Sequence, residues 1–239
     1  MMKVRPLVLA LSLAATAEAQ QQTSKPPSPI HPDTPKPAPV VKLSATTYRI
    51  GEMTIDTAAK TLTVPGTVND VPTLEFLANT TNGGKAYESA LSLQSNAVTF
   101  NAALLVLGLD PARSKASMVQ FDKAAPEGDP VELTISWNAG GKTRTEPIEE
   151  LLVDQRSNKT LPKGPWVYTG SRFFDTGEHR IYLAQQDGVL IGFMHGPQSI
   201  IDNPRADALG GYGFYVINPQ LGLKPGSPIT VTVKALPRK

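Results

Sequence analysis

The chain has 239 residues, a formal net charge of +2 and no cysteine. Without cysteine it has no disulfide, no thiolate metal site, no iron–sulfur cluster and no cysteine nucleophile. Its 23 Lys and Arg are interspersed with 21 Asp and Glu, so the sequence lacks the basic clusters that bind nucleic acid. We therefore expect a domain stabilised by its apolar core alone, with no cofactor.

The first 19 residues have the three parts of a secretory signal peptide. Lys3 and Arg5 carry positive charge, and an almost wholly apolar run follows them. Ala17 and Ala19 then supply the small side chains that a signal peptidase requires. We predict cleavage after Ala19, and the apolar run is shorter than the roughly 20 residues that span a bilayer. The mature protein is expected in the periplasm or outside the cell, with no transmembrane segment.

A proline-rich segment, residues 20–41, separates this leader from the globular domain, residues 42–239. It contains seven prolines and almost no apolar side chains. Proline restricts the backbone and removes hydrogen-bond donors, so we predict a disordered, extended tether. A role as a ligand for another protein is the alternative, but no aromatic residue or arginine flanks the prolines.

The first half of the domain combines short strands with one helix. Strands are predicted at residues 53–56, 61–64 and 74–78. Residues 95–107 form the clearest helix, and Gly108 and Pro111 follow it with the usual signals of a helix end. The apolar stripe is wide enough to predict a buried helix. One face is expected to contain Val98, Ala102, Leu105 and Leu109, widened by Phe100, Leu104 and Leu107.

The second half is dominated by strands. Apolar and polar residues alternate over 131–137, which indicates a half-buried strand that opens a hairpin. Thr145 precedes a proline and two glutamates, and this pattern predicts a short helix up to Leu152. Further strands are expected at 166–169, 180–184, 189–193, 212–217 and 229–235. The predicted fold class is α+β, an antiparallel-rich β-sheet domain with one buried helix and one short helix.

An ordered series of short blocks resembles a known family. The blocks are Leu62–Gly66, Gly83–Leu91, Ala102–Gly108, Pro130–Trp137, Trp166–Phe173, Leu190–Pro204 and Gly226–Val233. Their order is similar to that of the YdjY-like domain family of exported bacterial proteins. The resemblance covers nearly everything from about residue 50 onward, but it implies no defined activity. Tyr87 stands where that pattern has a histidine before Glu-Ser, so a role for that histidine does not carry over.

Two candidate sites involve carboxylates and histidines. Asp175 begins an Asp-Thr-Gly string after two phenylalanines, which is the motif of aspartic peptidases. That chemistry needs a second carboxylate, and the same string is common in turns between strands. A metal site would use His179, His195 and Asp175, with Asp202 as a further ligand. No metal-binding motif is present, so isolated structural histidines are the alternative.

Weaker candidates for ligand binding are Glu88, Ser89, Arg172, Asp202 and Tyr212. Glu88-Ser89 also fits a cap or an edge-strand pair. Arg172 and Asp202 fit a structural ion pair equally well. Tyr212 lies in a Gly-rich aromatic run, where aromatic rings on a loop can stack on ligands. The alternative is one face of an ordinary strand.

Two functions remain open from the sequence. The first is a non-catalytic envelope or extracellular module that binds a protein or a polymer. The second is an extracytoplasmic enzyme, hydrolytic or metal-assisted, that uses carboxylates with His179 or His195. Convergence of these side chains in one pocket favours the enzyme, and separation favours the binding module.

Overall fold

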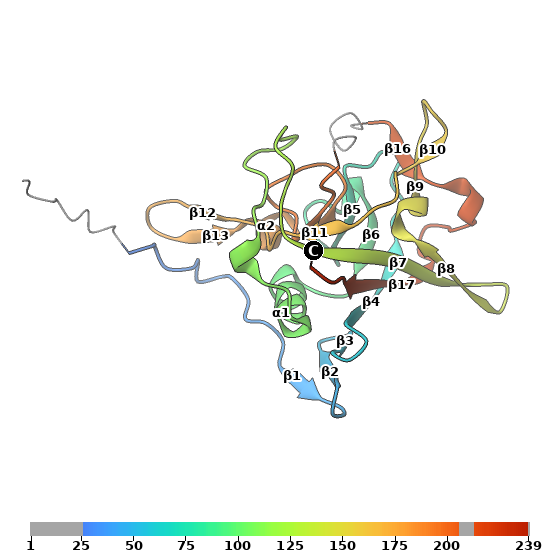
Figure 1. Ribbon diagram of the computed structural model, residues 1–239. Coiled ribbons are helices and arrows are strands. Elements are labelled where there is room, and N and C mark those ends of the chain that lie inside the picture. The colour runs from blue at the N-terminus through green and yellow to red at the C-terminus, as the bar shows by residue number, and fades with distance from the viewer. Residues whose placement is uncertain (1–25, 206–212, 239) are drawn as a thin grey trace, which may run out of the picture.

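The computed structural model describes residues 26–205 and 213–238 of the chain (Figure 1). The structure is mostly β, with 39% strand and 14% helix, and the described residues contain only two α-helices. The predicted α+β class is therefore wrong. No helix in these residues is long and apolar enough to span a membrane.

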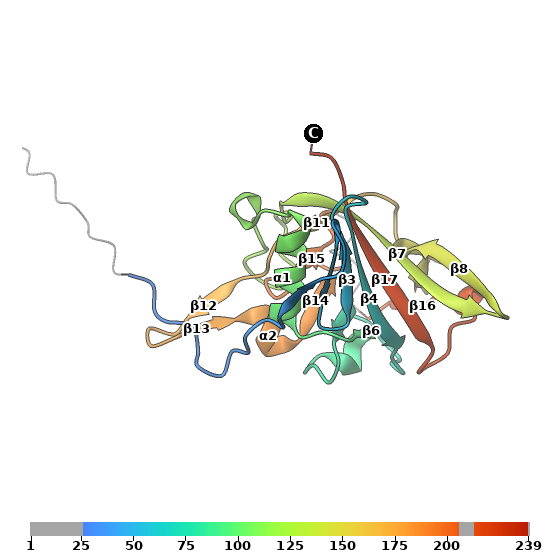
Figure 2. The same cartoon turned by 90° about the horizontal axis from the view of Figure 1, so that it is seen from below.

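Eight strands close into a barrel, in which each strand is paired with two neighbours. The pairing of β4 with β6 completes the ring. Strand β17 pairs with β4 on one side and with β7 on the other along nearly its whole length, as Figure 2 shows. In order around the ring the strands are β4 (Thr61–Val68), β17 (Pro228–Ala235), β7 (Asp129–Ala139), β11 (Trp166–Tyr168), β15 (Ile201–Asp202), β14 (Val189–Gly192), β5 (Phe76–Thr80) and β6 (Ser89–Leu93).

Ring closure depends on a change of partner within β4. Its first residues pair with β3 (Met53–Asp56), whereas Gly66 to Val68 pair with β6. Pro65 lies between the two halves, and its missing N–H is tolerated where the ladder changes partner. Gly66 has no side chain at a point where a Cβ would collide with the backbone of Ser92. Strand β4 can therefore continue while its pairing partner changes from β3 to β6.

The remaining strands extend or flank the barrel. Strands β1 (Val40–Lys42) and β2 (Thr47–Ile50) continue the sheet beyond β3, and β8 (Lys142–Pro147) forms a hairpin with β7. A small sheet contains β10 (Lys159–Thr160), β9 (Leu152–Asp154) and β16 (Tyr215–Ile217). Strands β12 (Phe173–Asp175) and β13 (Arg180–Tyr182) form a separate two-stranded hairpin, which projects from the barrel in Figure 1.

The predicted central helix is present as α1 (Ala97–Leu107). The side chain of Asn96 accepts a hydrogen bond from the Thr99 amide at 2.7 Å, and Gly108 ends the helix with φ of 101°. Its predicted apolar face is only partly correct. Phe100 and Leu104 are buried, but Leu105 is 43% exposed. The stripe that faces β3, β4 and β14 contains Ala97, Phe100, Ala103, Leu104 and Leu107.

The predicted short helix from Thr145 to Leu152 is wrong. Residues up to Pro147 belong to β8, whose backbone pairs with β7, and only a 3₁₀ turn, η3 (Ile148–Leu151), follows. Pairing with the long β7 strand outweighs the local helix-start signal. A second α-helix occurs instead at α2 (Leu183–Asp187), directly after β13. The other 3₁₀ turns are η1 (Ala86–Glu88), η2 (Pro111–Arg113) and η5 (Pro219–Leu221).

The described part of the proline-rich segment contacts the hairpin and α1. The amide of His31 donates to the carbonyl of Arg180 at 2.9 Å, and the Arg180 amide donates to Pro29 at 2.7 Å. Further along, the Ala38 amide donates to the hydroxyl of Thr99. Residues 29–31 therefore lie beside β13 as an additional extended segment.

Candidate functional site

Asp175 and His179 lie at the tip of the β12–β13 hairpin, where Asp175 is exposed and His179 is half-buried. The Asp175 carboxylate accepts a hydrogen bond from the Gly177 amide at 2.8 Å, and the Thr176 amide donates to the carbonyl of His179. The Gly177 N–H, together with Ser28, lowers the pKa of Asp175. The Asp-Thr-Gly string is therefore a hairpin turn that holds an ionised carboxylate.

His195 and Asp202 are buried, away from solvent. The backbone N–H groups of Gly196 and Asn203 donate to the Asp202 carboxyl at 3.2 and 2.8 Å. Burial outweighs these two contacts and raises the pKa of Asp202 well above its usual range. The predicted structural pair of Asp202 with Arg172 is absent from the ion pairs of the described residues.

The ring of His195 is oriented by the backbone. Its Nδ1 lies 2.7 Å from the carbonyl oxygen of Asp122, which only accepts hydrogen bonds, so Nδ1 carries the proton. In the neutral ring Nε2 is then an acceptor, and it is buried without a hydrogen-bond partner among the described residues. Within those residues no group of three or more His, Cys, Asp or Glu side chains is arranged to hold a metal ion. The structure thus does not bring His195 together with His179 and Asp175.

Glu88 and Ser89 have local structural partners. The Glu88 carboxylate lies 2.8 Å from the Lys85 ammonium, and this hydrogen bond raises the pKa of Lys85. The Ser89 hydroxyl donates to the Lys85 carbonyl at 2.7 Å and is buried. Both contacts close the turn before β6. Tyr212 lies outside the described residues.

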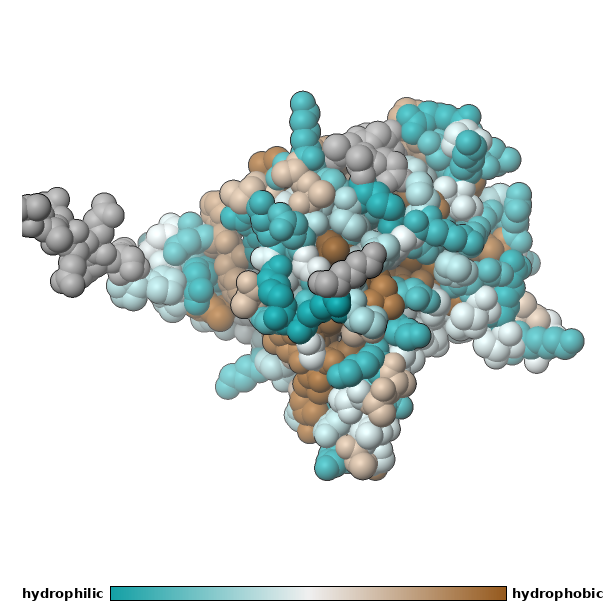
Figure 3. Space-filling model, viewed as in Figure 1, coloured by the Kyte–Doolittle hydropathy of each residue, from teal (hydrophilic) through white to brown (hydrophobic). Residues whose placement is uncertain are grey.

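A surface that the sequence indicated only through Arg172 lies between the hairpin and the loop before β7. We call it the hairpin surface, and it consists of Met118, Val119, Arg172, Phe173 and Phe174. Its four apolar side chains are between 45% and 63% exposed. A guanidinium nitrogen of Arg172 contacts the sulfur of Met118, which joins the loop to the hairpin. Figure 3 shows apolar atoms in the region where this loop lies above the hairpin in Figure 1.

A cavity of about 510 Å³ opens on the hairpin surface. Arg172, Phe173 and Met118 lie on its wall, with Ser114 and Lys115 from the loop. Lys115 forms an ion pair with Glu127, whereas Arg172 has no carboxylate within ion-pair distance in the described part of the chain. The cavity therefore combines apolar walls with an uncompensated positive charge.

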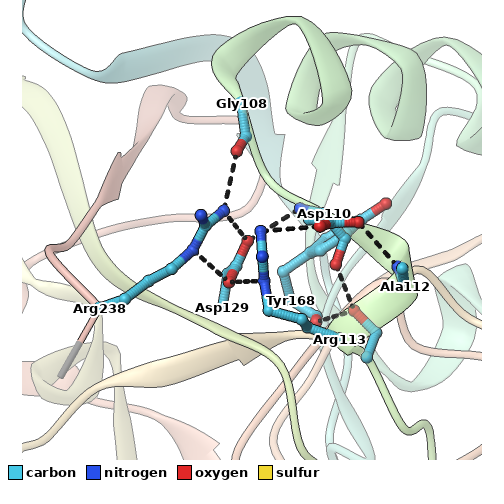
Figure 4. Close-up of polar contacts among 8 residues, drawn as sticks. Gly108, Asp110, Ala112, Arg113, Asp129, Tyr168 and Arg238 are labelled. Atoms are coloured by element: carbon cyan, nitrogen blue, oxygen red, sulfur yellow. Dashed lines mark hydrogen bonds and ion pairs between the residues drawn. The ribbon is translucent and has the colours of Figure 1, made fainter.

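A second cluster, also missed from the sequence, surrounds the buried carboxylate of Asp129 (Figure 4). Both Nε and Nη2 of Arg238 donate to it at 2.8 Å, Arg113 donates at 3.3 Å, and the Asp110 amide at 2.8 Å. Burial opposes ionisation, but the contacts with Arg238 and Asp110 outweigh it and lower the pKa of Asp129. The amide of Leu236 also donates to a backbone carbonyl beside Asp129. This cluster fastens the segment after β17 to the barrel.

A family model described as the YdjY domain matches residues 53–234, which is most of the chain. The chain belongs to the YdjY domain family. The resemblance seen in the sequence blocks is thereby confirmed. Neither the curated proteins nor the solved structures include a match.

The YdjY domain contains the whole barrel up to Lys234 of β17, both helices and the complete hairpin surface. Two of the contacts described above come from outside it. Arg238, which binds Asp129, follows the matched region, and Pro29 and His31, which bind β13, precede it. The hairpin surface thus lies entirely within the matched region.

Proposed function

We propose that this protein is an exported, non-catalytic module that binds a protein partner through the hairpin surface. The observation that carries the proposal is the concentration of four half-exposed apolar side chains around Arg172. Soluble proteins expose single apolar side chains routinely, but several on two adjoining segments, here β12 and the loop before β7, are typical of an interaction site. Arginine, methionine and aromatic residues are also the types enriched at protein interfaces.

The energy available at this surface suits a reversible partner. Full burial of a large apolar side chain contributes about 1.5–3 kcal/mol. The four side chains have roughly half of their surface left to bury, which gives about 3–6 kcal/mol in total before the entropic cost of association. A carboxylate placed against Arg172 would add a charge-assisted hydrogen bond.

The alternative, an enzyme that uses carboxylates and histidines, has less support. Asp175 and His179 lie at the hairpin tip, whereas His195 and Asp202 are buried, with His195 under the loop before β7. A reaction needs an acid, a base and a substrate within hydrogen-bond reach of one another. The separation of the candidates into two places favours the binding module.

Export is part of the proposal because residues 1–19 have the charge, apolar run and small residues of a signal peptide. The test is N-terminal sequencing of the protein purified from the periplasm and from the medium of its native host. A mature chain that begins at Gln20 supports export. A chain that keeps residues 1–19 and stays in the cytoplasm contradicts it.

Binding is tested by site-specific photo-crosslinking in the same host. A photoreactive amino acid replaces Phe174 or Met118, and the control replaces Leu105, which is also large, apolar and exposed but lies on α1. We expect a crosslinked adduct of discrete mass from the two hairpin positions and none from Leu105. Equal adducts from all three positions, or none from the hairpin, would contradict the proposal.

A further inference from the structure

Among the described residues, hairpin β12–β13 leaves one of its two edges open. The amide of Arg180 donates to Pro29 and its carbonyl accepts from His31, so both backbone groups point away from β12. Asp175 lies opposite Arg180 in the register and is therefore the non-hydrogen-bonded partner in this pair. It follows that the N–H and C=O of Asp175 also point outward, on the other side of the hairpin.

The alternation along the strand extends this result to Phe173. The Leu183 amide donates to the carbonyl of Arg172, and the Thr176 amide donates to His179, so these residues bond inward. Since successive residues alternate, Phe173 and Asp175 present the outward groups of β12. These groups have no backbone partner within the described residues, and all three residues of the strand are exposed.

The same hairpin already holds an extended segment on its opposite edge. Pro29 to His31 lie beside Arg180 of β13, with the two hydrogen bonds of 2.7 and 2.9 Å described above. Main-chain hydrogen bonds of this kind bind an added strand in many peptide-recognition domains. The β12 edge offers an equivalent row of groups with no occupant from this chain among the described residues.

We propose that the partner is an extended protein segment that adds antiparallel to β12 and places a carboxylate against Arg172. This inference rests on the proposed function and names the binding mode of the same surface. An antiparallel strand runs from Asp175 toward Phe173, so its carboxyl end reaches the cavity beside Arg172. A parallel strand would bring its amino end to the unpaired guanidinium, which is unfavourable. Alternate side chains of the added strand face Phe174 and Met118.

The experiment uses a library of random dodecapeptides displayed on phage with a free carboxyl terminus, selected on the immobilised full-length mature protein. Enriched peptides are synthesised, and their affinities are measured for wild type, Arg172→Gln and Arg144→Gln. Arg144 is the control because it is an exposed arginine on β8, outside the hairpin. We expect acidic peptides whose binding is weakened about tenfold or more by Arg172→Gln and less than about twofold by Arg144→Gln.

Backbone measurements distinguish strand addition from simple apolar contact. N-methylation of the peptide should abolish binding at every second residue and have little effect at the residues between. Amide exchange measured by NMR should slow at Phe173 and Asp175 when the peptide binds. Failure to enrich any peptide, uniform sensitivity to N-methylation, or protection elsewhere would overturn the inference. Crosslinking at Phe174 without these signatures would leave the proposed function intact and reject only strand addition.

Discussion

Helix α1 offers a comparison of one substitution at two adjacent positions. Leu104 is fully buried against the barrel, whereas Leu105 is 43% exposed. Leu→Ala at a fully buried site costs about 2.7–5 kcal/mol, because both transfer free energy and cavity formation contribute. At a position like Leu105 the cost is expected to be about 0.5 kcal/mol. Both substitutions change helix propensity equally, so the difference measures burial alone.

The free energy of unfolding is measured by urea titration, with the fluorescence of the buried Trp166 as one signal and far-UV circular dichroism as the other. For a domain of this size 1 kcal/mol shifts Tm by about 2–4 °C. Leu104→Ala should therefore lower Tm by about 5–20 °C, and Leu105→Ala by about 1–2 °C. An unchanged slope against urea confirms that only stability has changed. Equal losses, or a larger loss at Leu105, would refute the packing of α1 described here.

Three further substitutions test other contacts, each by urea unfolding. Gly128→Ala should prevent stable folding, because the carbonyl of Tyr168 occupies the space that a Cβ needs. Arg238→Gln should cost about 1–3 kcal/mol, since the buried Asp129 loses two charge-assisted hydrogen bonds, and near-wild-type stability would contradict this role. Burial raises the folded-state pKa of Asp202 above its usual 3.8, so its contribution to stability is complete below that pH and is lost as pH rises through the folded pKa. Asp202→Asn should remove this decline, and an identical pH profile for the variant would show that Asp202 does not titrate as described.

The sequence predicted most individual elements but not how they assemble. Alternation identified the strand that begins near Val131, and the capping pattern identified α1 with its end at Gly108. These signals are local, because they depend on the period of side chains and on one backbone angle. Closure of the barrel depends on pairings between distant residues, such as Gly66 with Leu93, and on parallel pairs such as β5 with β6. No local pattern encodes such contacts, so the class was predicted as α+β with an antiparallel-rich sheet.

Pro65 follows directly after the strand predicted at residues 61–64. A proline inside a strand pattern usually marks an end or an edge. In the structure the strand continues to Val68, because the chain exchanges one neighbour for another at this residue. The rule for proline in strands correctly indicates a missing hydrogen bond, but it does not indicate that β4 gains β6 as a second partner. The same limit applies to the apolar face of α1, where a stripe of leucines does not show which side meets the barrel.

The hairpin surface shows why the function was harder to predict from the sequence than the fold. In the sequence, Phe173 and Phe174 precede Asp175 in a peptidase-like string, which predicts a role for the carboxylate and none for the two rings. The structure makes Asp175 a turn residue bonded to Gly177, and exposes the two rings instead. Two adjacent phenylalanines in a strand point to opposite faces, so burial of both requires cover on each side. A two-stranded hairpin that stands clear of the barrel has no such cover, and the exposed pair is therefore available to a partner.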